Sequence, residues 1–372
     1  MKYRRFGQLD WDVSVLGFGV QSLPLTITAG ETADLIRTAV DRGVNYLDLG
    51  SPEDDRFEHT AKLIGSAMED GYRERIRLAA HIPVSRLRSA TDLDTLLVRQ
   101  LELLQLERMD FLILEGLNRN SWPTLLELGV LDRSETLRAA GRIGALGFSF
   151  RDHQQILRKI LADYDQWDLC QFQYSYMDAD HLPGLGGVRL ANRKGLAIVA
   201  VEPLRGGRLV RNPPQQVAEI WAGAARARTL AAWGLHWVWN HQEVATVVCD
   251  MSTREQVVLN STLAGSAEAG SLSIKEQVLF GRVRDAYRKL KPIPCAACRV
   301  CMPCPQDIDV PRILDLYNDA VMYQDAETAR ALYQKEQHHL DDCNECGVCA
   351  NACGRMIAIL DWLQKARDML ED

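Results

Sequence analysis

Two similar runs of cysteine near the carboxyl end constrain this chain more than any other feature. They hold eight of its ten cysteines and read Cys295-x2-Cys298-x2-Cys301-x2-Cys304 and Cys343-x2-Cys346-x2-Cys349-x3-Cys353. A tight turn at each x2 spacing can direct three thiolates toward the irons of one cubane. Such triplets are typical of ferredoxins, so the runs predict two 4Fe–4S clusters.

The fourth cysteine of each run decides how the ligands divide. In two-cluster ferredoxins it binds the cluster of the other run. By that analogy, Cys353 joins the cluster of the first triplet, and Cys304 joins the cluster of the second. Two zinc sites, each with four thiolate ligands, remain the alternative, although zinc ribbons usually pair their cysteines. The remaining Cys170 and Cys249 fall in predicted strands and are interpreted as buried apolar residues.

Charge separates the cysteine-rich tail from the rest of the chain. Residues 291–372 carry 8 Lys and Arg against 14 Asp and Glu, a balance of −6 within a total of −7 for all 372 residues. We expect a first domain over 1–265, a helical linker over 266–294 and a small α-helical, ferredoxin-like domain over 295–372. Apolar residues at helical spacing predict helices over 310–323 and 356–370 of the tail.

The first 265 residues alternate short apolar runs with amphipathic stretches. This pattern predicts eight parallel strands separated by helices, which fits a (β/α)8 barrel in number and length. A doubly wound open sheet is the alternative, disfavoured because no G-x-G-x-x-G follows the first strand. The predicted strands are 13–19, 45–50, 76–82, 109–116, 144–150, 168–176, 196–203 and 245–251.

Overall charge and hydropathy limit the classes of partner. The pI of about 5.7 argues against nucleic acid, which requires a basic face. No uncharged apolar run reaches the roughly 18 residues of a membrane span, and no apolar stretch follows the amino-terminal Arg4 and Arg5. We therefore expect no membrane span and a cytoplasmic protein, with its thiols reduced rather than in disulfides.

Several segments together resemble the aldo-keto reductase family. They are YRRFGQLDWDVSVLGFGVQSLP, GVNYLDLG, GALGFSF, QFQYSY, GLAIVAVEPLRGG and MSTREQVVLN, spread over roughly 260 residues. EPLRGG at 202–207, followed by the cysteine-rich tail, is similar to the branch of that family with carboxyl-terminal ferredoxin-like motifs. The resemblance implies a (β/α)8 barrel, an oxidoreductase and bound iron–sulfur clusters.

The family's catalytic tetrad is largely substituted. The resemblance implies an Asp, a Tyr proton donor, a Lys and a carbonyl-orienting His, and of these only Asp48 is present. Glu53 stands at the Tyr position, His81 at the Lys position and Glu115 at the His position. We expect Glu53 as a candidate acid with a raised pKa and His81 or Glu115 as the base. The alternative is an idle or remodelled pocket.

The resemblance also implies residues for NAD(P)H. Ser149 and Gln171 would bind the carboxamide, and Tyr174 would stack on the nicotinamide. At the adenosine-phosphate end the implied residues are Ser252, Gln256 and Asn260, near a helix amino terminus that suits phosphate. Asp250 beside them would repel a 2′-phosphate, so nicotinamide binding stays open and NADP is disfavoured.

Together these features predict an iron–sulfur oxidoreductase with a non-standard active site. Electrons would pass through two 4Fe–4S clusters to a small molecule in the barrel mouth or to a redox protein that docks on the acidic tail. Two alternatives remain open. One is an acid–base lyase, dehydratase or isomerase that uses Glu53, His81 and Glu115 with structural clusters, and the other is a catalytically silent electron-transfer scaffold.

Overall fold

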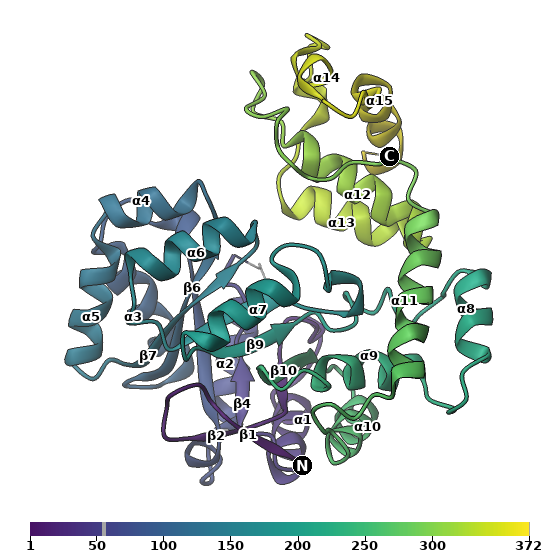
Figure 1. The fold of residues 1–372 in the computed structure, drawn as a ribbon. Coiled ribbons are helices and arrows are strands. Elements are labelled where there is room, and N and C mark those ends of the chain that lie inside the picture. Colours follow the sequence, from purple (N-terminus) through teal and green to yellow (C-terminus); the bar gives the residue numbers. More distant parts are fainter. Residues whose placement is uncertain (54–56, 372) are drawn as a thin grey trace. The chain divides into compact units, whose positions relative to one another are not determined.

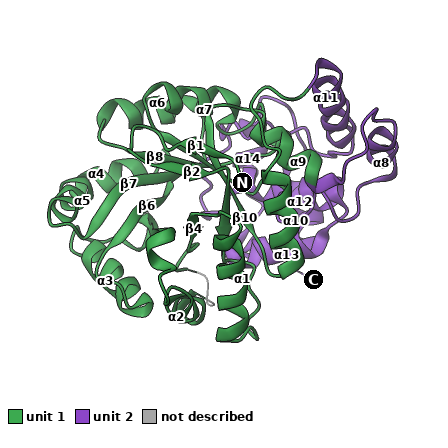
Figure 2. Ribbon diagram, turned by 90° about the horizontal axis from the view of Figure 1, so that it is seen from below, with its two compact units in different colours: residues 1–204, 232–272 green, residues 205–231, 273–372 purple. Residues whose placement is uncertain are grey.

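The computed structural model describes residues 1–53 and 57–371. They form two compact units, one of residues 1–204 and 232–272 and one of residues 205–231 and 273–372 (Figures 1 and 2). The segment 205–231 leaves the barrel sequence after its seventh strand and belongs to the second unit. We call the first unit the barrel unit and the second the cluster unit.

The barrel unit is a closed ring of eight parallel strands, which confirms the predicted (β/α)8 fold and shows that the open-sheet alternative is wrong. The ring order is β10-β3-β4-β5-β6-β7-β8-β9, so sequence neighbours pair throughout. The strands are β3 (Leu16–Gly19), β4 (Tyr46–Asp48), β5 (Arg77–Pro83), β6 (Met109–Leu117), β7 (Ile143–Phe150), β8 (Leu169–Gln173), β9 (Ala197–Val201) and β10 (Val244–Asp250).

Helices cover the outside of the ring (Figure 2). They are α1 (Ala29–Asp41), α2 (Phe57–Ala67), α3 (Asp92–Leu104), α4 (Ser121–Glu127), α5 (Val130–Ala139), α6 (Gln154–Asp163), α7 (Gly184–Arg193), α9 (Leu230–Trp239) and α10 (Arg254–Ala264). Capping boxes start two of them: Thr28 with Glu31 at α1, and Thr253 with Gln256 at α10.

A hairpin of β1 (Tyr3–Arg5) and β2 (Asp12–Ser14) precedes the ring. Phe6, which follows β1, packs inside the ring against Tyr46 and Phe111, with ring centroids 5.9 and 5.0 Å away. Arg4 donates hydrogen bonds to the backbone carbonyls of Trp239, His241 and Val244. Apolar side chains therefore fill the amino-terminal half of the barrel.

Register determines which side chains face the barrel interior. Paired residues of parallel strands point to the same side, as do residues two apart on one strand. Interior apolar residues are therefore followed, two positions closer to the mouth, by polar ones. Asp48 follows Tyr46, His81 follows Ala79, Glu115 follows Ile113, Gln171 follows Leu169, and Asp250 follows Val248.

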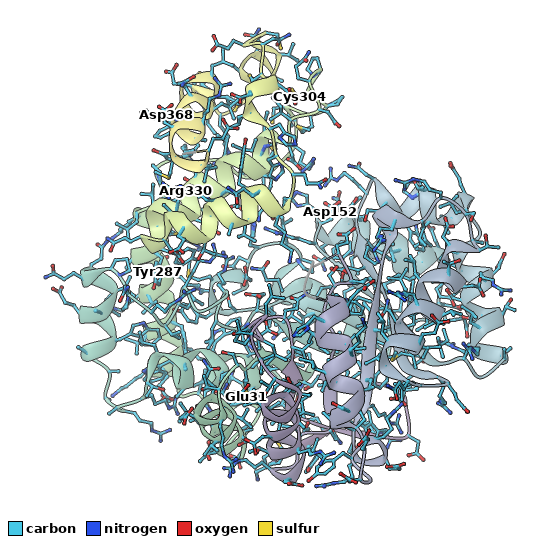
Figure 3. The ribbon with its side chains drawn as sticks, turned by 180° about the vertical axis from the view of Figure 1, so that it is seen from behind. Glu31, Asp152, Tyr287, Cys304, Arg330 and Asp368 are labelled. Carbon is cyan, nitrogen blue, oxygen red and sulfur yellow. The ribbon has the colours of Figure 1, made fainter. Side chains whose placement is uncertain are left out.

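The cluster unit is helical, as predicted for the tail. Its helices are α8 (Gln215–Ala222), α11 (Ile274–Lys289), α12 (Val310–Tyr323), α13 (Ala326–Lys335), α14 (Val348–Ala352) and α15 (Ile359–Leu370). α12, α13 and α15 share one apolar core that includes Cys349, and five of the other motif cysteines pack against it. Arg330 on α13 donates to the Met369 carbonyl on α15, 2.8 Å away (Figure 3).

A buried ion pair fastens the segment 205–231 within the cluster unit. Arg208 Nη1 lies 2.8 Å from Asp319 Oδ2 on α12, and both side chains are buried. Arg205 lies 3.6 Å from the same carboxylate, and both guanidinium groups contact the ring of Tyr323. The sequence does not indicate this ion pair, because Arg208 and Asp319 are 111 residues apart.

No helix of the described residues is long and apolar enough to cross a membrane.

Asn318 offers a test of the cluster unit's core. Its buried amide accepts from Ile293 N (2.9 Å) and donates to Ile293 O (3.0 Å), which holds the chain before the first cysteine run against α12. Asn318→Ala leaves both backbone groups buried and unsatisfied, so we expect a loss of about 2–4 kcal/mol in the free energy of unfolding. Urea unfolding followed by cluster absorbance measures this, and the control is Gln334→Ala, at an exposed position on α13 outside both cysteine runs. Equal midpoints for the two variants would contradict the assignment.

Candidate active site and cluster-binding loops

Asp48 and His81 form a buried pair at the carboxyl ends of β4 and β5. His81 Nε2 lies 3.0 Å from Asp48 Oδ1, and each residue is only 5% exposed. Gln171 on β8 donates from Nε2 to Asp48 Oδ2 (2.9 Å), and Gly50 N donates to Oδ1 (2.9 Å). Three strands of the ring therefore converge on one carboxylate.

Asp48 and His81 each stabilise the charged form of the other. Burial lowers the pKa of His81, but the charge and hydrogen bond of Asp48, with the charge of Glu115, outweigh it and raise the pKa to about 8. Burial raises the pKa of Asp48, but the interactions with His81, Gly50 and Gln171 outweigh it, so the pKa lies below its ordinary value. At neutral pH the pair is therefore an imidazolium and a carboxylate.

Glu115 faces the other nitrogen of His81. Its Oε2 lies 4.0 Å from His81 Nδ1, which is too far for a hydrogen bond. Within residues 1–53 and 57–371 neither of these two buried atoms has a hydrogen-bond partner. The Glu115 side chain is 29% exposed, whereas that of His81 is 6% exposed. A polar substrate atom could accept a proton from Nδ1, and Glu115 could exchange protons with solvent.

Glu53 lies apart from this group. It is exposed, and its Oε1 accepts a hydrogen bond from Ser85 Oγ, 2.6 Å away, after β5. No hydrogen bond joins it to Asp48, His81 or Glu115 in the described part of the chain. The structure thus brings together three of the four tetrad-position residues and leaves Glu53 on the rim.

The residues expected at the nicotinamide have other partners. Ser149 Oγ accepts from Gly116 N (2.9 Å), and the Gln171 amide nitrogen is used by Asp48. Tyr174 is buried, with its ring 5.0 Å from Trp237 and 5.5 Å from His241. Its ring therefore packs against α9 and the turn that follows it.

At the adenosine-phosphate end, Gln256 caps α10. Its Oε1 accepts from Ser252 N (2.8 Å) and Thr253 N (3.3 Å). Asn260 is largely buried one turn later. Asp250 lies over Gly19, where an added Cβ would come within 2.2 Å of Asp250 Oδ1. Two of the amide donors expected for a phosphate are thus used by a side chain, and a carboxylate lies nearby.

One positioning residue was missed from the sequence. Gln100 on α3 is buried and donates from Nε2 to the His81 carbonyl, 2.8 Å away. It fixes the end of β5 where His81 projects. Only its polarity on the apolar face of an amphipathic helix could have signalled this, because the contact spans 19 residues.

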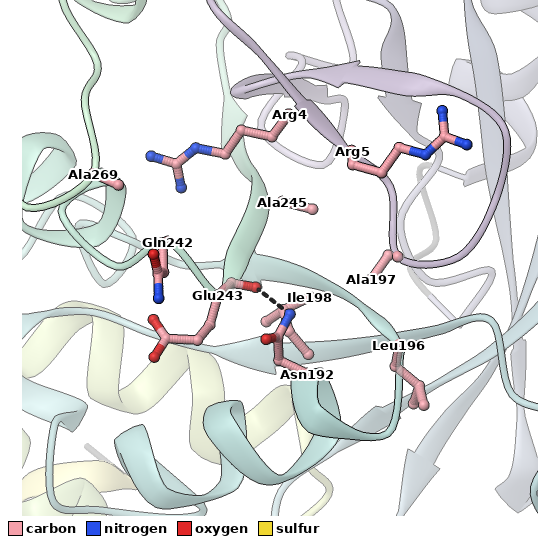
Figure 4. Close-up of a pocket in the computed structure, with 11 residues that line it drawn as sticks. Arg4, Arg5, Asn192, Leu196, Ala197, Ile198, Gln242, Glu243, Ala245 and Ala269 are labelled. Atoms are coloured by element: carbon pink, nitrogen blue, oxygen red, sulfur yellow. Dashed lines mark hydrogen bonds between the residues drawn. The ribbon is translucent and has the colours of Figure 1, made fainter.

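A cavity of about 430 Å³ lies at the opposite, amino-terminal end of β9 and β10 (Figure 4). Arg4, Asn192 and Glu243 are among its lining residues. Arg4 is bonded to three carbonyls, Asn192 donates to Glu243 O (3.4 Å), and Glu243 pairs with Arg189. The cavity contains none of the predicted site residues, and polar groups at this end of a barrel usually serve stability.

The two cysteine runs share left-handed residues at the same two spacer positions. The second spacer residue of the first Cys-x2-Cys is left-handed in both, at Ala297 (φ 52°) and Glu345 (φ 56°). The first spacer residue of the second Cys-x2-Cys is likewise left-handed, at Arg299 (φ 61°) and Gly347 (φ 73°). Such turns direct backbone N–H groups toward anions, and Ala297 N donates to Cys295 Sγ (3.4 Å).

The correspondence continues beyond the fourth cysteines. Asp307 and Met356, each three residues further on, are both left-handed, and Asp309 and Ala358 cap α12 and α15 with nearly equal angles. The extra residue before Cys353 lies in the short helix α14. The two loops therefore share their left-handed positions and the caps of the helices that follow, which the cysteine spacing alone did not reveal.

The thiols suit clusters. All eight are free, and Cys298 and Cys346 are exposed. Burial and the neighbouring thiols of Cys295 and Cys349 raise the pKa of Cys301 to about 11, and burial with Cys304 and Cys343 raises that of Cys349. Iron would hold such crowded thiolates deprotonated. Among the described residues, no three His, Cys, Asp or Glu side chains lie close enough together to hold a single metal ion.

The pKa of His81 predicts a pH-dependent stability. His81 titrates at 6.5 when unfolded and at about 8 when folded. The stabilisation that His81 adds to the free energy of unfolding is complete below pH 6.5. It is lost as the pH rises through 8, a change of about 2 kcal/mol. Thermal unfolding of the wild type and His81→Gln, measured from pH 6 to 9, should show their difference shrinking by this amount. Parallel curves would contradict the raised pKa.

Cluster binding predicts a selective loss of iron. We expect Cys349→Ser to lower bound iron and sulfide by about half or more, because one thiolate ligand is removed. Cys249→Ser is the matched control, because this buried thiol lies on β10 and should leave the iron content unchanged. Iron and sulfide analysis after anaerobic purification measures both. Equal iron in the two variants, or zinc in place of iron, would contradict cluster binding.

Comparisons with known proteins agree with this architecture. A model of the aldo/keto reductase family matches residues 15–264, and a model of the 4Fe-4S dicluster domain matches residues 294–358. No curated protein matches the chain.

Solved aldo-keto reductases share the fold. One from Bacillus halodurans is 22% identical with a TM-score of 0.62, and the match covers 76% of this chain and 96% of that one. One from Klebsiella pneumoniae, in complex with NADPH, is 21% identical with a TM-score of 0.61, covering 76% and 95%. Because the family match spans most of the chain, this protein belongs to the aldo/keto reductase family and carries an additional 4Fe–4S dicluster domain.

Proposed function

We propose that this iron–sulfur oxidoreductase reduces a small unsaturated molecule at the barrel mouth with single electrons, and that His81 supplies a proton. The observation that carries the proposal is the buried Asp48–His81 pair, whose second imidazole nitrogen faces Glu115 without a hydrogen bond. The pair replaces the acid–base machinery that the family resemblance implies.

His81 is suited to donate a proton. Asp48 accepts from its Nε2 and stabilises the imidazolium, and Gln171 holds the other carboxylate oxygen. Nδ1–H then remains as the donor. A substrate oxygen or nitrogen placed between His81 and Glu115 would receive this proton as negative charge develops on it. Asp48, Gln171 and Gln100 are positioning residues in this scheme.

The overall change balances as two electrons and two protons added across one unsaturated bond. When bound, the clusters supply single electrons. His81 gives one proton and the second comes from solvent. Solvent then reprotonates His81 by way of Glu115, whose side chain is partly exposed and must close the 4.0 Å gap to Nδ1. We further propose that two clusters are bound, with Cys353 completing the first and Cys304 the second, since Cys304 and Cys343 both lie near Cys349.

NADPH is the competing donor because the family's solved members include an NADPH complex. Several features of this chain disfavour it. Gln256 uses amide donors at the start of α10, Tyr174 is buried in the wall, and Asp250 would repel a 2′-phosphate. A reduced protein partner, which is the electron donor that we propose, does not need to bind a nicotinamide or a 2′-phosphate in the barrel.

Replacement of His81 tests the proposal. With reduced methyl viologen as donor and a panel of aldehydes, ketones, imines and enones, we expect wild-type turnover that falls as the pH rises through about 8. His81→Gln should lower turnover about 10²- to 10⁴-fold, as for loss of an acid catalyst, with unchanged iron content. Exposed His59→Gln is the control.

Two outcomes would overturn this assignment. Robust NADPH-dependent turnover by cluster-free protein would restore the ordinary hydride mechanism. Turnover that needs no reductant and is lost in Glu53→Gln would instead favour the lyase alternative.

A further inference from the structure

The two cluster-binding loops share their left-handed positions and differ in charge. The 11-residue stretches 291–301 and 339–349 align cysteine for cysteine, and their left-handed residues coincide. The first contains Lys291 and Arg299 and no acidic residue, whereas the second contains Asp341, Asp342 and Glu345 and no Lys or Arg. Because the turns between the cysteines share these left-handed positions, the opposite charges of the two stretches are a clear difference between the two cluster environments.

The positive charges lie close to the first loop. Lys291 Nζ approaches the Cys295 carbonyl at 3.5 Å, and Arg355 Nη1 donates to the Pro294 carbonyl at 3.0 Å. Arg299 pairs with Asp309 at 3.0 Å, which offsets its own charge. Two cations therefore remain beside the backbone of the first loop.

The negative charges of the second loop are mostly uncompensated. Asp341, Asp342 and Glu345 are all exposed. Asp341 lies 3.6 Å from Arg367 with its side chain 85% exposed, so water screens this pair strongly. Among the described residues, no salt bridge involves Asp342 or Glu345. The second loop thus presents an acidic rim to solvent.

Negative charge near a cluster opposes the addition of an electron and lowers the reduction potential. Positive charge near a cluster, such as that of Lys291 and Arg355 beside the first loop, raises the reduction potential. We infer that electrons enter at the loop of Cys343 to Cys349, whose cluster has the lower reduction potential, and pass to the cluster of the Cys295 to Cys301 loop. The donor loses one electron at each encounter, and no proton moves in either transfer.

The acidic rim also indicates the kind of donor. Both loops expose a cysteine and a valine, Cys298 with Val300 (61% exposed) and Cys346 with Val348 (45% exposed), and only the second loop adds three exposed carboxylates to them. An apolar centre with a charged rim is typical of a docking surface, and complementary charge accelerates association. The occupant is a one-electron donor protein with a basic docking face. This inference rests on the proposed electron relay.

Two small reductants of opposite charge test whether electrons enter at the loop of Cys343 to Cys349. The triple variant Asp341→Asn, Asp342→Asn, Glu345→Gln removes the acidic rim with nearly unchanged volume. Stopped-flow reduction at low salt should become about three- to tenfold slower with the methyl viologen radical cation and faster with dithionite, whose reactive form is an anion. The matched control is Asp285→Asn, Glu327→Gln, Asp368→Asn, which removes three exposed carboxylates from α11, α13 and α15 (Figure 3 labels Asp368).

Potentials measured by EPR-monitored redox titration test the direction of transfer. We expect two signals with different reduction potentials. In the triple variant that removes the acidic rim, only the signal with the lower potential should shift, and it should shift to a higher potential. Cys346→Ser, which changes a ligand of the second loop, should perturb that same lower-potential signal.

The inference is overturned if the higher-potential signal shifts, if neither shifts, or if the control triple gives the same changes. These readouts do not depend on substrate turnover. If the potentials behave as expected while His81→Gln remains fully active, the proposed function fails and the electron route stands.

Discussion

The hydrogen-bonded charge pair of Asp48 and His81 determines what the barrel mouth can do. An imidazole buried to this degree would ordinarily lose its proton. The carboxylate beside it reverses that preference, and Gln171 and Gly50 fix the carboxylate. The structure therefore maintains a protonated group inside an apolar barrel at neutral pH, although the Tyr and Lys of the family's usual site are absent.

Two different chemistries coexist in the chain. The barrel unit offers a proton at a fixed place, and the cluster unit offers thiolate loops suited to one-electron carriers. In an ordinary aldo-keto reductase, hydride brings both electrons together, so no cluster is needed. Here the substitutions at the Tyr, Lys and His positions accompany an added dicluster domain. Under the proposed function, the clusters replace the hydride donor and His81 replaces the Tyr as the proton donor.

Much of the fold could be predicted, because it depends on local patterns. Apolar runs placed all eight strands of the ring within a few residues, and helical spacing located α12 and α15. The arrangement of the site was harder to predict from the sequence. Glu53 was expected beside His81, yet it bonds to Ser85 on the rim, and Tyr174 was expected at the mouth, yet it packs against Trp237. One residue of register or rotation redirects a side chain, and sequence similarity cannot resolve that difference.

The sequence by itself determined the iron–sulfur motifs, the family and the barrel, because cysteine spacing and strand periodicity are local properties of the chain. Only the tertiary structure decided that His81, Asp48, Gln171 and Glu115 meet, since these residues come from four separate strands. It also decided that the segment 205–231 joins the cluster unit through Arg208 and Asp319, and that left-handed residues coincide in the two cysteine loops, whose difference in charge the sequence already shows. Long-range contacts of this kind depend on how the chain closes in space, which spacing along the sequence does not specify.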